Sequence, residues 1–259
     1  MRHQMIITNE KERATLIEAG KRLARVMAAL KEKVTEGVTA EELDDLAEQM
    51  IRDGGDTPAF LGYTPEGALR PYPSALCVSV NDEVVHGIPN ESQKVLKEGD
   101  IVGLDFGLIH EGVVVDAALT LPVGKIDAES KKLLRATEKA LAAGIAAARI
   151  GNHMGDISNA IQKEIESAGF SVVKSLGGHG VGNKVHEEPF IANFGKAGTG
   201  RELKEGTVLA LEPISAAGKA AVTIAPDGYT YRTKDGSRSA HFEHTILIEG
   251  DKARIITTL

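Results

Sequence analysis

Two apolar runs with one aspartate each decide the fold of this chain: Gly103-Leu104-Asp105-Phe106-Gly107 and Val113-Val114-Val115-Asp116-Ala117. Both runs are typical of buried strands, and His110-Glu111-Gly112 between them predicts a hairpin tip. Strands paired around that tip would place Asp105 directly opposite Asp116, with Cβ atoms roughly 5 Å apart. Two buried like charges repel, and a divalent cation between them would remove that penalty. The alternative is one aspartate in an exposed turn and the other at a strand edge.

Helical patterns lie on both sides of this hairpin. Apolar residues recur at helical spacing after Asn9, and Thr39-Ala40-Glu41-Glu42 predicts a capped helix that ends at Gly54-Gly55. A second helix pair is predicted over roughly 128–149 and 153–168. Further strands are expected around 75–80, 171–175, 207–212, 220–225, 239–248 and 253–257.

The order helix pair, strands, helix pair, strands predicts an α+β fold with halves at roughly 10–125 and 126–259. The helix pairs align at an offset of 114 residues, which maps Gly37 onto Gly151. Internal duplication explains this alignment, but two amphipathic helix pairs can also align by chance. Because no linker-like segment divides the halves, we expect residues 1–259 to form a single domain with a site at the seam between its sheets.

The composition is that of an ordinary globular protein. The 259 residues carry a net charge of −7, which argues against a broad nucleic-acid-binding surface. Cys77 is the only cysteine, as expected in a reducing compartment. The N-terminal residues lack a signal-peptide pattern, and the apolar run 141–150 is too short to span a bilayer. We therefore expect a cytoplasmic protein with no membrane contact.

Three more residues could complete a metal site with the two aspartates. Glu212 and Glu243 lie in strand-like runs, where a lone glutamate more often faces solvent. His179 lies in a glycine-rich loop that no helix start follows, so phosphate binding is disfavoured and the glycines would bring His179 close to a bulky or charged group. Four carboxylates and one imidazole suit two divalent ions such as Mn, Fe, Co or Zn. Such a pair can share a hydroxide and polarise a carbonyl, which predicts a di-metal hydrolase.

The chain resembles the type I methionine aminopeptidases of the pita-bread fold, which creatinase and aminopeptidase P share. The resemblance extends from about residue 5 over nearly the whole chain. It is most specific in six motifs: His86-Gly87-Ile88-Pro89, Leu104-Asp105-Phe106-Gly107, Gly178-His179-Gly180-Val181-Gly182, His186-Glu187-Glu188-Pro189, Leu211-Glu212-Pro213 and Phe242-Glu243-His244-Thr245. Only 26 residues separate His186 from Glu212, which leaves no room for the helical insertion of type II enzymes. The resemblance implies two pseudo-symmetric halves, with antiparallel sheets covered by helix pairs.

The resemblance also implies an activity, namely removal of the N-terminal methionine of nascent polypeptides whose second residue is small. It implies five ligands for two divalent ions (Co, Mn, Fe or Zn): Asp105, Asp116, His179, Glu212 and Glu243. Asp116 and Glu243 would bridge the ions, and the ion beside Asp105 would take the α-amine. A bridging hydroxide would attack the first peptide bond while Glu212 shuttles the proton.

Two histidines have roles that only the resemblance implies. His186 would hydrogen-bond the carbonyl oxygen as charge develops, and His86 would contact the substrate near the scissile amide. From the residues alone, a single histidine such as His86 in a turn-like segment is more often a surface residue, and neither His86 nor His186 can be assigned a role.

The methionine pocket is where the chain departs from the family pattern. Its expected walls are Tyr63, Tyr72, Cys77 and Tyr229. The segment 64–71 is longer than the usual loop between the two tyrosines, and both a lid and a surface elaboration fit it. Phe60 and Val185 stand where a cysteine and an aromatic residue are expected.

Two other functions are found among proteins of this fold. Proline-directed aminopeptidases of the same fold usually carry an extra N-terminal domain, whereas the motifs here begin near the first residue. Non-catalytic relatives have lost metal ligands, whereas all five positions are filled here. We expect a monomer, with the ribosome as a further candidate partner.

Overall fold

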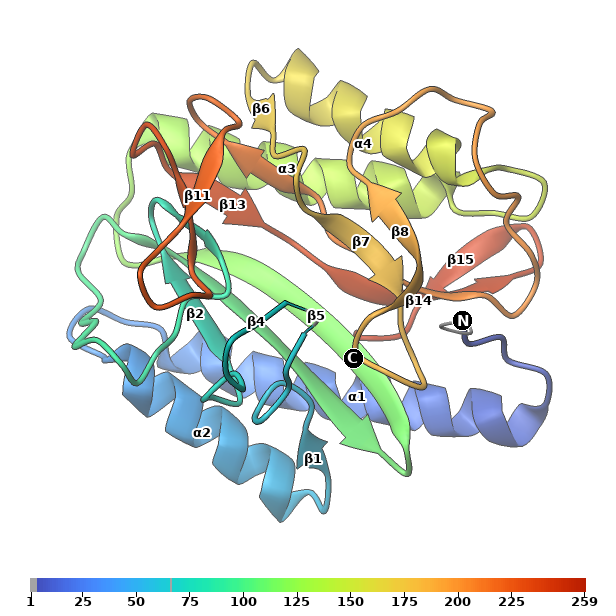
Figure 1. The fold of residues 1–259 in the computed structure, drawn as a ribbon, viewed down its shortest axis with the longest axis horizontal. Coiled ribbons are helices and arrows are strands. Elements are labelled where there is room, and N and C mark those ends of the chain that lie inside the picture. The colour runs from blue at the N-terminus through green and yellow to red at the C-terminus, as the bar shows by residue number, and fades with distance from the viewer. Residues whose placement is uncertain (1–3, 66) are drawn as a thin grey trace.

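The computed structural model describes residues 4–65 and 67–259. Two helix pairs lie on opposite outer faces of the molecule, and the sheets lie between them (Figure 1). The helices are α1 (Glu10–Lys33), α2 (Ala40–Asp53), α3 (Ala128–Ala147) and α4 (Met154–Ser167). The predicted capping box is present at the start of α2, where the Thr39 and Glu42 side chains each accept a hydrogen bond from the other residue's backbone N–H. No helix within the described ranges has the length and apolar character needed to cross a bilayer.

The second helix pair repeats the first at the predicted offset. Both α2 and α4 are 14 residues long, and their bounds differ by 114 positions. The glycines before them, Gly37 and Gly151, have φ values of 88° and 84°, and the glycines after them, Gly55 and Gly169, have 79° and 85°. Matching bounds and matching left-handed turns favour internal duplication over a chance alignment.

Within residues 4–65 and 67–259, the strands form four antiparallel sheets. In the first half, β4 (Ile101–His110) pairs with β1 (Thr57–Pro58), β2 (Cys77–Val80) and β5 (Val113–Pro122). In the second half, a five-stranded sheet has the order β15 (Lys252–Ile255), β14 (His244–Glu249), β9 (Val208–Leu211), β7 (Gly177–Gly180) and β8 (Glu187–Ala192). One small sheet joins β13 (Ser239–His241), β10 (Ile214–Ala216) and β6 (Ser171–Val172). The other joins β11 (Val222–Ile224), β12 (Tyr231–Thr233) and β3 (Glu83–Val85).

Each helix pair packs its apolar face on the sheets of its own half. Leu16, Leu23 and Leu43 from the first pair are fully buried in one core with Leu104 and Phe106 of β4. Leu133, Ile157 and Ile161 from the second pair are fully buried in another core with Leu209 and Ile246. Each such side chain contributes roughly 1.5–3 kcal/mol by leaving water. The two cores hold the halves' sheets in place on either side of the seam.

The expected register of the central hairpin was wrong by two residues. The tip is only Glu111-Gly112, at φ 47° and 83°, as a tight two-residue turn requires. Asp116 therefore pairs with Gly107, and Asp105 pairs with Ala118. The aspartates are diagonal neighbours, not directly opposite. Because a shift of two residues preserves the facing of side chains, both still lie on one face of the sheet.

Two strand predictions also need correction. The glycine-rich segment expected to be a loop contains strand β7, between β8 and β9. Its glycines do permit a close approach, but the approaching atoms are backbone: a Cβ on Gly178 would lie 2.4 Å from Ala210 O, and one on Gly180 would lie 2.3 Å from Glu188 O. The strand expected over 239–248 is interrupted at residues 242–243, which separates β13 from β14.

Candidate metal centre

The site lies where β9 leads into β10 and β13 leads into β14. At this point the two paired segments leave one sheet and enter the next. Leu211 pairs with His244 in the five-stranded sheet, and Ile214 pairs with His241 in the small sheet. Continuing either register through the gap places Glu212 opposite Glu243. Pro213 has no N–H to donate, so the pairing is weakened at this point and consists of a hydrogen bond from Phe242 N to Pro213 O at 3.4 Å.

The hairpin from the first half is joined to this interruption by its backbone. Glu243 N donates to Ala118 O at 2.8 Å, and Ala118 N donates to Glu243 O at 3.4 Å. The Thr245 hydroxyl accepts from Asp116 N at 2.9 Å and donates to Asp116 O at 2.8 Å. These bonds join β5 of the hairpin to the segment that carries Glu243. They thereby place the side of the hairpin with Asp116 and Asp105 near the two glutamates.

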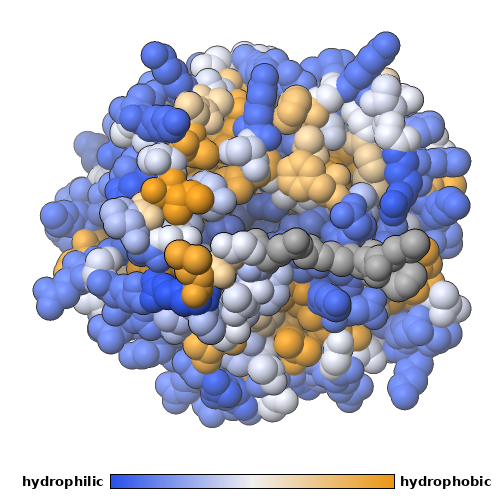
Figure 2. Space-filling model, in the orientation of Figure 1, coloured by the Kyte–Doolittle hydropathy of each residue, from blue (hydrophilic) through white to orange (hydrophobic). Residues whose placement is uncertain are grey.

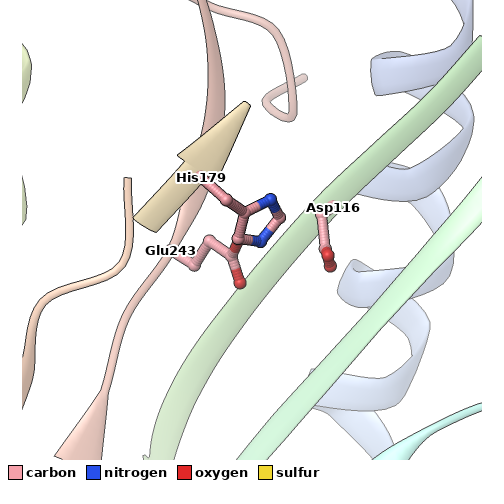
Figure 3. Close-up of side chains that lie close together, drawn as sticks. All are labelled: Asp116, His179 and Glu243. Atoms are coloured by element: carbon pink, nitrogen blue, oxygen red, sulfur yellow. The ribbon is translucent and has the colours of Figure 1, made fainter. Parts of the chain in front are cut away.

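The structure brings the expected ligands into two overlapping groups. One ligand atom each from Asp116, His179 and Glu243 lie within 4.8 Å of one another (Figure 3). A second group with the same spacing contains Glu212, Glu243 and His241. Glu243 belongs to both groups, and bridging of two ions by Asp116 and Glu243 stays a prediction. Asp105 lines the same cavity but belongs to neither group found in the described part of the chain.

The carboxylates of this cluster lack the partners that buried charges need. Asp105, Asp116 and Glu243 are 7%, 2% and 3% exposed. Within the described ranges, one oxygen of each has no hydrogen-bond donor: Asp105 Oδ1, Asp116 Oδ1 and Glu243 Oε1. A cation satisfies acceptor-only oxygens packed in this way, so the donor set fits divalent metal ions.

The pKa values of these carboxylates also show that their ionised forms are poorly stabilised in the metal-free protein. Burial, then the charge of Glu212, raises the pKa of Asp116 to about 8, and burial raises that of Glu212 to about 7. Burial and the neighbouring carboxylates raise the pKa values of Asp105 and Glu243 well above their usual range. Ionising all four groups is therefore costly unless positive charge is supplied.

All eleven expected site residues line one cavity, which has an empty volume of about 570 Å³ and opens to solvent. On the face seen in Figure 2, apolar side chains gather around a hollow near the centre. The five expected ligands and the two histidines lie with an apolar wall formed by Tyr63, Tyr72, Cys77 and Tyr229. Phe60 and Pro65 also belong to this wall. Val185 is buried but is not among the lining residues.

The longer loop is part of that wall. It contributes Pro65, and its far end is tied down by Arg70. Arg70 forms an ion pair with Glu91 and donates to Asp227 O at 3.0 Å. The Tyr229 hydroxyl donates to Arg70 O at 2.5 Å, so the loop also fixes a wall residue. These contacts join Pro65 and Arg70 to the pocket wall, and the choice between a lid and a surface elaboration stays open.

The two further histidines, His86 and His186, line the same cavity as the metal cluster. His186 Nδ1 lies 2.9 Å from the Tyr63 hydroxyl, and its ring meets the His179 ring edge-on at 4.5 Å between centroids. His86 adopts a left-handed φ of 59°, a conformation that is uncommon for non-glycine residues. Burial lowers the pKa of His86 to about 4, so the ring is neutral near pH 7.

Sequence reasoning missed His241 in the second ligand group. It lies two residues before Glu243, and residues two apart on a strand share a face. That spacing could have identified it.

Comparison with known proteins agrees with this site. A model of metallopeptidase family M24 matches residues 14–250. A methionine aminopeptidase of Clostridium perfringens is 44% identical over 255 residues, 98% of this chain and 99% of the relative. The crystal structure of a methionine aminopeptidase from Thermotoga maritima superposes with a TM-score of 0.93 at 41% identity, covering 98% of this chain and 100% of that one.

A prolidase from Pyrococcus furiosus shares the fold at 21% identity, with a TM-score of 0.74 over 98% of this chain and 66% of that chain. The predicted α+β pita-bread fold is confirmed by these neighbours, and the buried carboxylate and histidine cluster accounts for the metal dependence of the family. The chain belongs to metallopeptidase family M24.

Proposed function

We propose that this protein is a methionine aminopeptidase that removes the first residue of polypeptides whose second residue is small. The observation that carries the proposal is one cavity with two unlike sets of lining residues. Four carboxylates and His179 form one set, and an apolar wall containing three tyrosines forms the other. A relative and a solved structure with this name match nearly the whole chain at 44% and 41% identity.

The expected ligands, Asp105, Asp116, His179, Glu212 and Glu243, would hold two divalent ions. When bound, these ions would supply an activated water nucleophile and polarise the scissile carbonyl. Glu212 would also take up and release the proton, which is the role that the resemblance implies for it. The apolar wall would orient the methionine side chain, a flexible thioether that fits irregular apolar space.

Both halves contribute to this chemistry. Asp105 and Asp116 come from the first half, whereas His179, Glu212 and Glu243 come from the second. We therefore propose that the whole chain acts as one catalytic domain. Since its proposed substrates are nascent polypeptides, we propose that it acts in the cytoplasm, with the ribosome as a candidate partner. We also propose that it is a monomer.

We expect His186→Ala to lower kcat about 100-fold with little change in KM. The proposed His186 contact to the carbonyl oxygen matters most in the transition state, and loss of a comparable hydrogen bond costs ~3 kcal/mol. Steady-state kinetics on Met-Ala-Ser measure both constants. Tyr63→Phe removes only the hydroxyl that orients His186 and should cost less. A rise in KM alone would assign His186 to substrate binding.

Peptides of the form Met-X-Ser, with X as Gly, Ala, Ser, Leu or Lys, test the proposed activity. We expect rapid cleavage for the three small residues and slow cleavage for Leu and Lys. Norleucine at the first position should still react, because small misfits in an apolar pocket cost only ~1–3 kcal/mol. Equal rates for Ala and Lys would show an open leaving side. Rapid cleavage of Leu-Ala-Ser would contradict methionine selectivity, and preferential cleavage of Ala-Pro peptides would favour the proline-directed alternative.

A further inference from the structure

A histidine that the proposed mechanism does not use lies against the Glu212 carboxylate. His241 ends β13 and is 4% exposed. Its Nε2 lies 3.2 Å from Glu212 Oε2, while His179 Nε2 lies 3.9 Å from the other oxygen, Oε1. Glu212 thus has one imidazole beside each of its oxygens.

The backbone of His241 is fixed from two sides. The Thr120 hydroxyl of β5 accepts from His241 N at 2.9 Å and donates to His241 O at 2.8 Å. On the other side, His241 pairs with Ile214 of β10, two residues after Glu212. Three strands therefore set the position of the ring relative to the carboxylate, which is a more rigid support than a loop provides.

The distances distinguish between the two glutamates. His241 Nε2 lies 3.7 Å from Glu243 Oε2, which is too long for a hydrogen bond, whereas 3.2 Å to Glu212 lies within range. At this distance His241 Nε2 is still without a formed hydrogen bond among the described residues. Catalytic hydrogen bonds are commonly loose in this way and tighten in the working complex.

The chemistry of the neighbours indicates how Nε2 is used. Ionised carboxylates only accept hydrogen bonds, so a nitrogen facing two of them is best matched when it carries the proton. A protonated ring nitrogen has no lone pair for a cation. In that protonation state His241 would be a partner of a metal ligand and not a ligand itself.

We propose that His241 is a positioning residue that donates a hydrogen bond from Nε2 to Glu212 Oε2 and holds Oε1 toward His179. The inference rests on the proposed function, because that function assigns Glu212 to the metal centre and to proton transfer. Hydrogen-bond partners of metal ligands typically change metal affinity or activity 10–100-fold when removed.

The test compares His241→Gln, which retains an N–H donor, with His241→Met, which fills similar space without one. Calorimetric titration of EDTA-treated protein with Mn²⁺ should show about 10–100-fold weaker binding for the Met variant. The Gln variant should bind within about threefold of the unchanged protein. The visible spectrum of the Co²⁺-loaded Met variant should differ from that of the unchanged protein, and that of the Gln variant should not. His241→Leu serves as the non-donor variant if the Met variant does not fold.

Each outcome of this comparison is decisive. Unchanged Mn²⁺ affinity in the Met variant would overturn the positioning role. Equally weak binding by the Gln and Met variants would overturn the donor role in favour of direct ligation by the imidazole. If the unchanged protein failed to cleave methionyl peptides while the order of affinities held, the proposed function would fail and the positioning role would stand.

Discussion

Asp105→Asn should reduce the rate of Met-Ala-Ser cleavage by roughly 1000-fold while leaving the fold intact. A metal ligand's share of transition-state stabilisation is several kcal/mol, and each 1.36 kcal/mol is tenfold in rate. The fold should survive because asparagine matches the shape and charge of a protonated aspartate. Burial raises the pKa of Asp105 well above its usual range, so the protonated form is the one that the metal-free protein accommodates.

Two measurements and a matched control variant test the effect of Asp105→Asn. Peptide kinetics at saturating Mn²⁺ report the loss of activity, and thermal unfolding of EDTA-treated protein reports the fold. Asp45→Asn makes the same chemical change at an exposed position on α2 and should leave both unchanged. Near-normal turnover of Asp105→Asn in metal-supplemented buffer would contradict the assignment of Asp105 as a ligand.

The metal-free protein should lose stability as pH rises from about 6.5 to 8. Asp116 has a folded-state pKa of about 8 against an ordinary value of 3.8, so the folded state holds a proton that the unfolded state has already released. A group of this kind stabilises the fold fully below its unfolded pKa, and the stabilisation is lost as pH rises through the folded value. For Asp116 alone the loss between pH 6.5 and 8 is about 2 kcal/mol. That corresponds to a fall in Tm of roughly 4–8 °C for a chain of this size.

Buried histidines act in the opposite direction at lower pH. Burial lowers the pKa values of His86, His241 and His244 to about 4, 3 and 4. These rings stay neutral in the folded state, whereas in the unfolded state they take up protons below about pH 6.5, which favours unfolding. Above about pH 6.5 only the loss of the carboxylate proton affects stability, so the free energy of unfolding falls most steeply there.

Differential scanning calorimetry of EDTA-treated protein between about pH 5.5 and 8.5 measures this profile. Mn²⁺ should raise Tm more at pH 8 than at pH 6, because protons compete with the metal for the carboxylates. Titration in two buffers with different ionisation enthalpies should also detect released protons near pH 7. A Tm that does not change with pH, without proton release, would show that the cluster is already ionised in the metal-free protein.

Local patterns in the sequence determined much of the fold. Helix periodicity, the Thr39-Glu42 capping box and paired glycines were sufficient to locate all four helices within a few residues. Asp105 and Asp116 were readable as candidates because an aspartate inside an apolar run is costly to bury without a counter-charge, whereas the roles of His86 and His186 came only from the resemblance. Those signals depend only on residues close together in the chain, and so they survive without knowledge of the fold.

The tertiary structure alone decided how the cluster is assembled. The register that separates Asp105 from Asp116 depends on a two-residue turn, and Glu212 meets Glu243 only because two strand pairs share one interruption. His241 became visible as a neighbour of Glu212 only through pairing between β10 and β13. Strand pairing joins residues far apart in the chain, and local preferences do not specify which strands meet or in what register. The sequence therefore contained the candidate ligands, whereas the long-range pairing of strands determined which of their atoms lie close together.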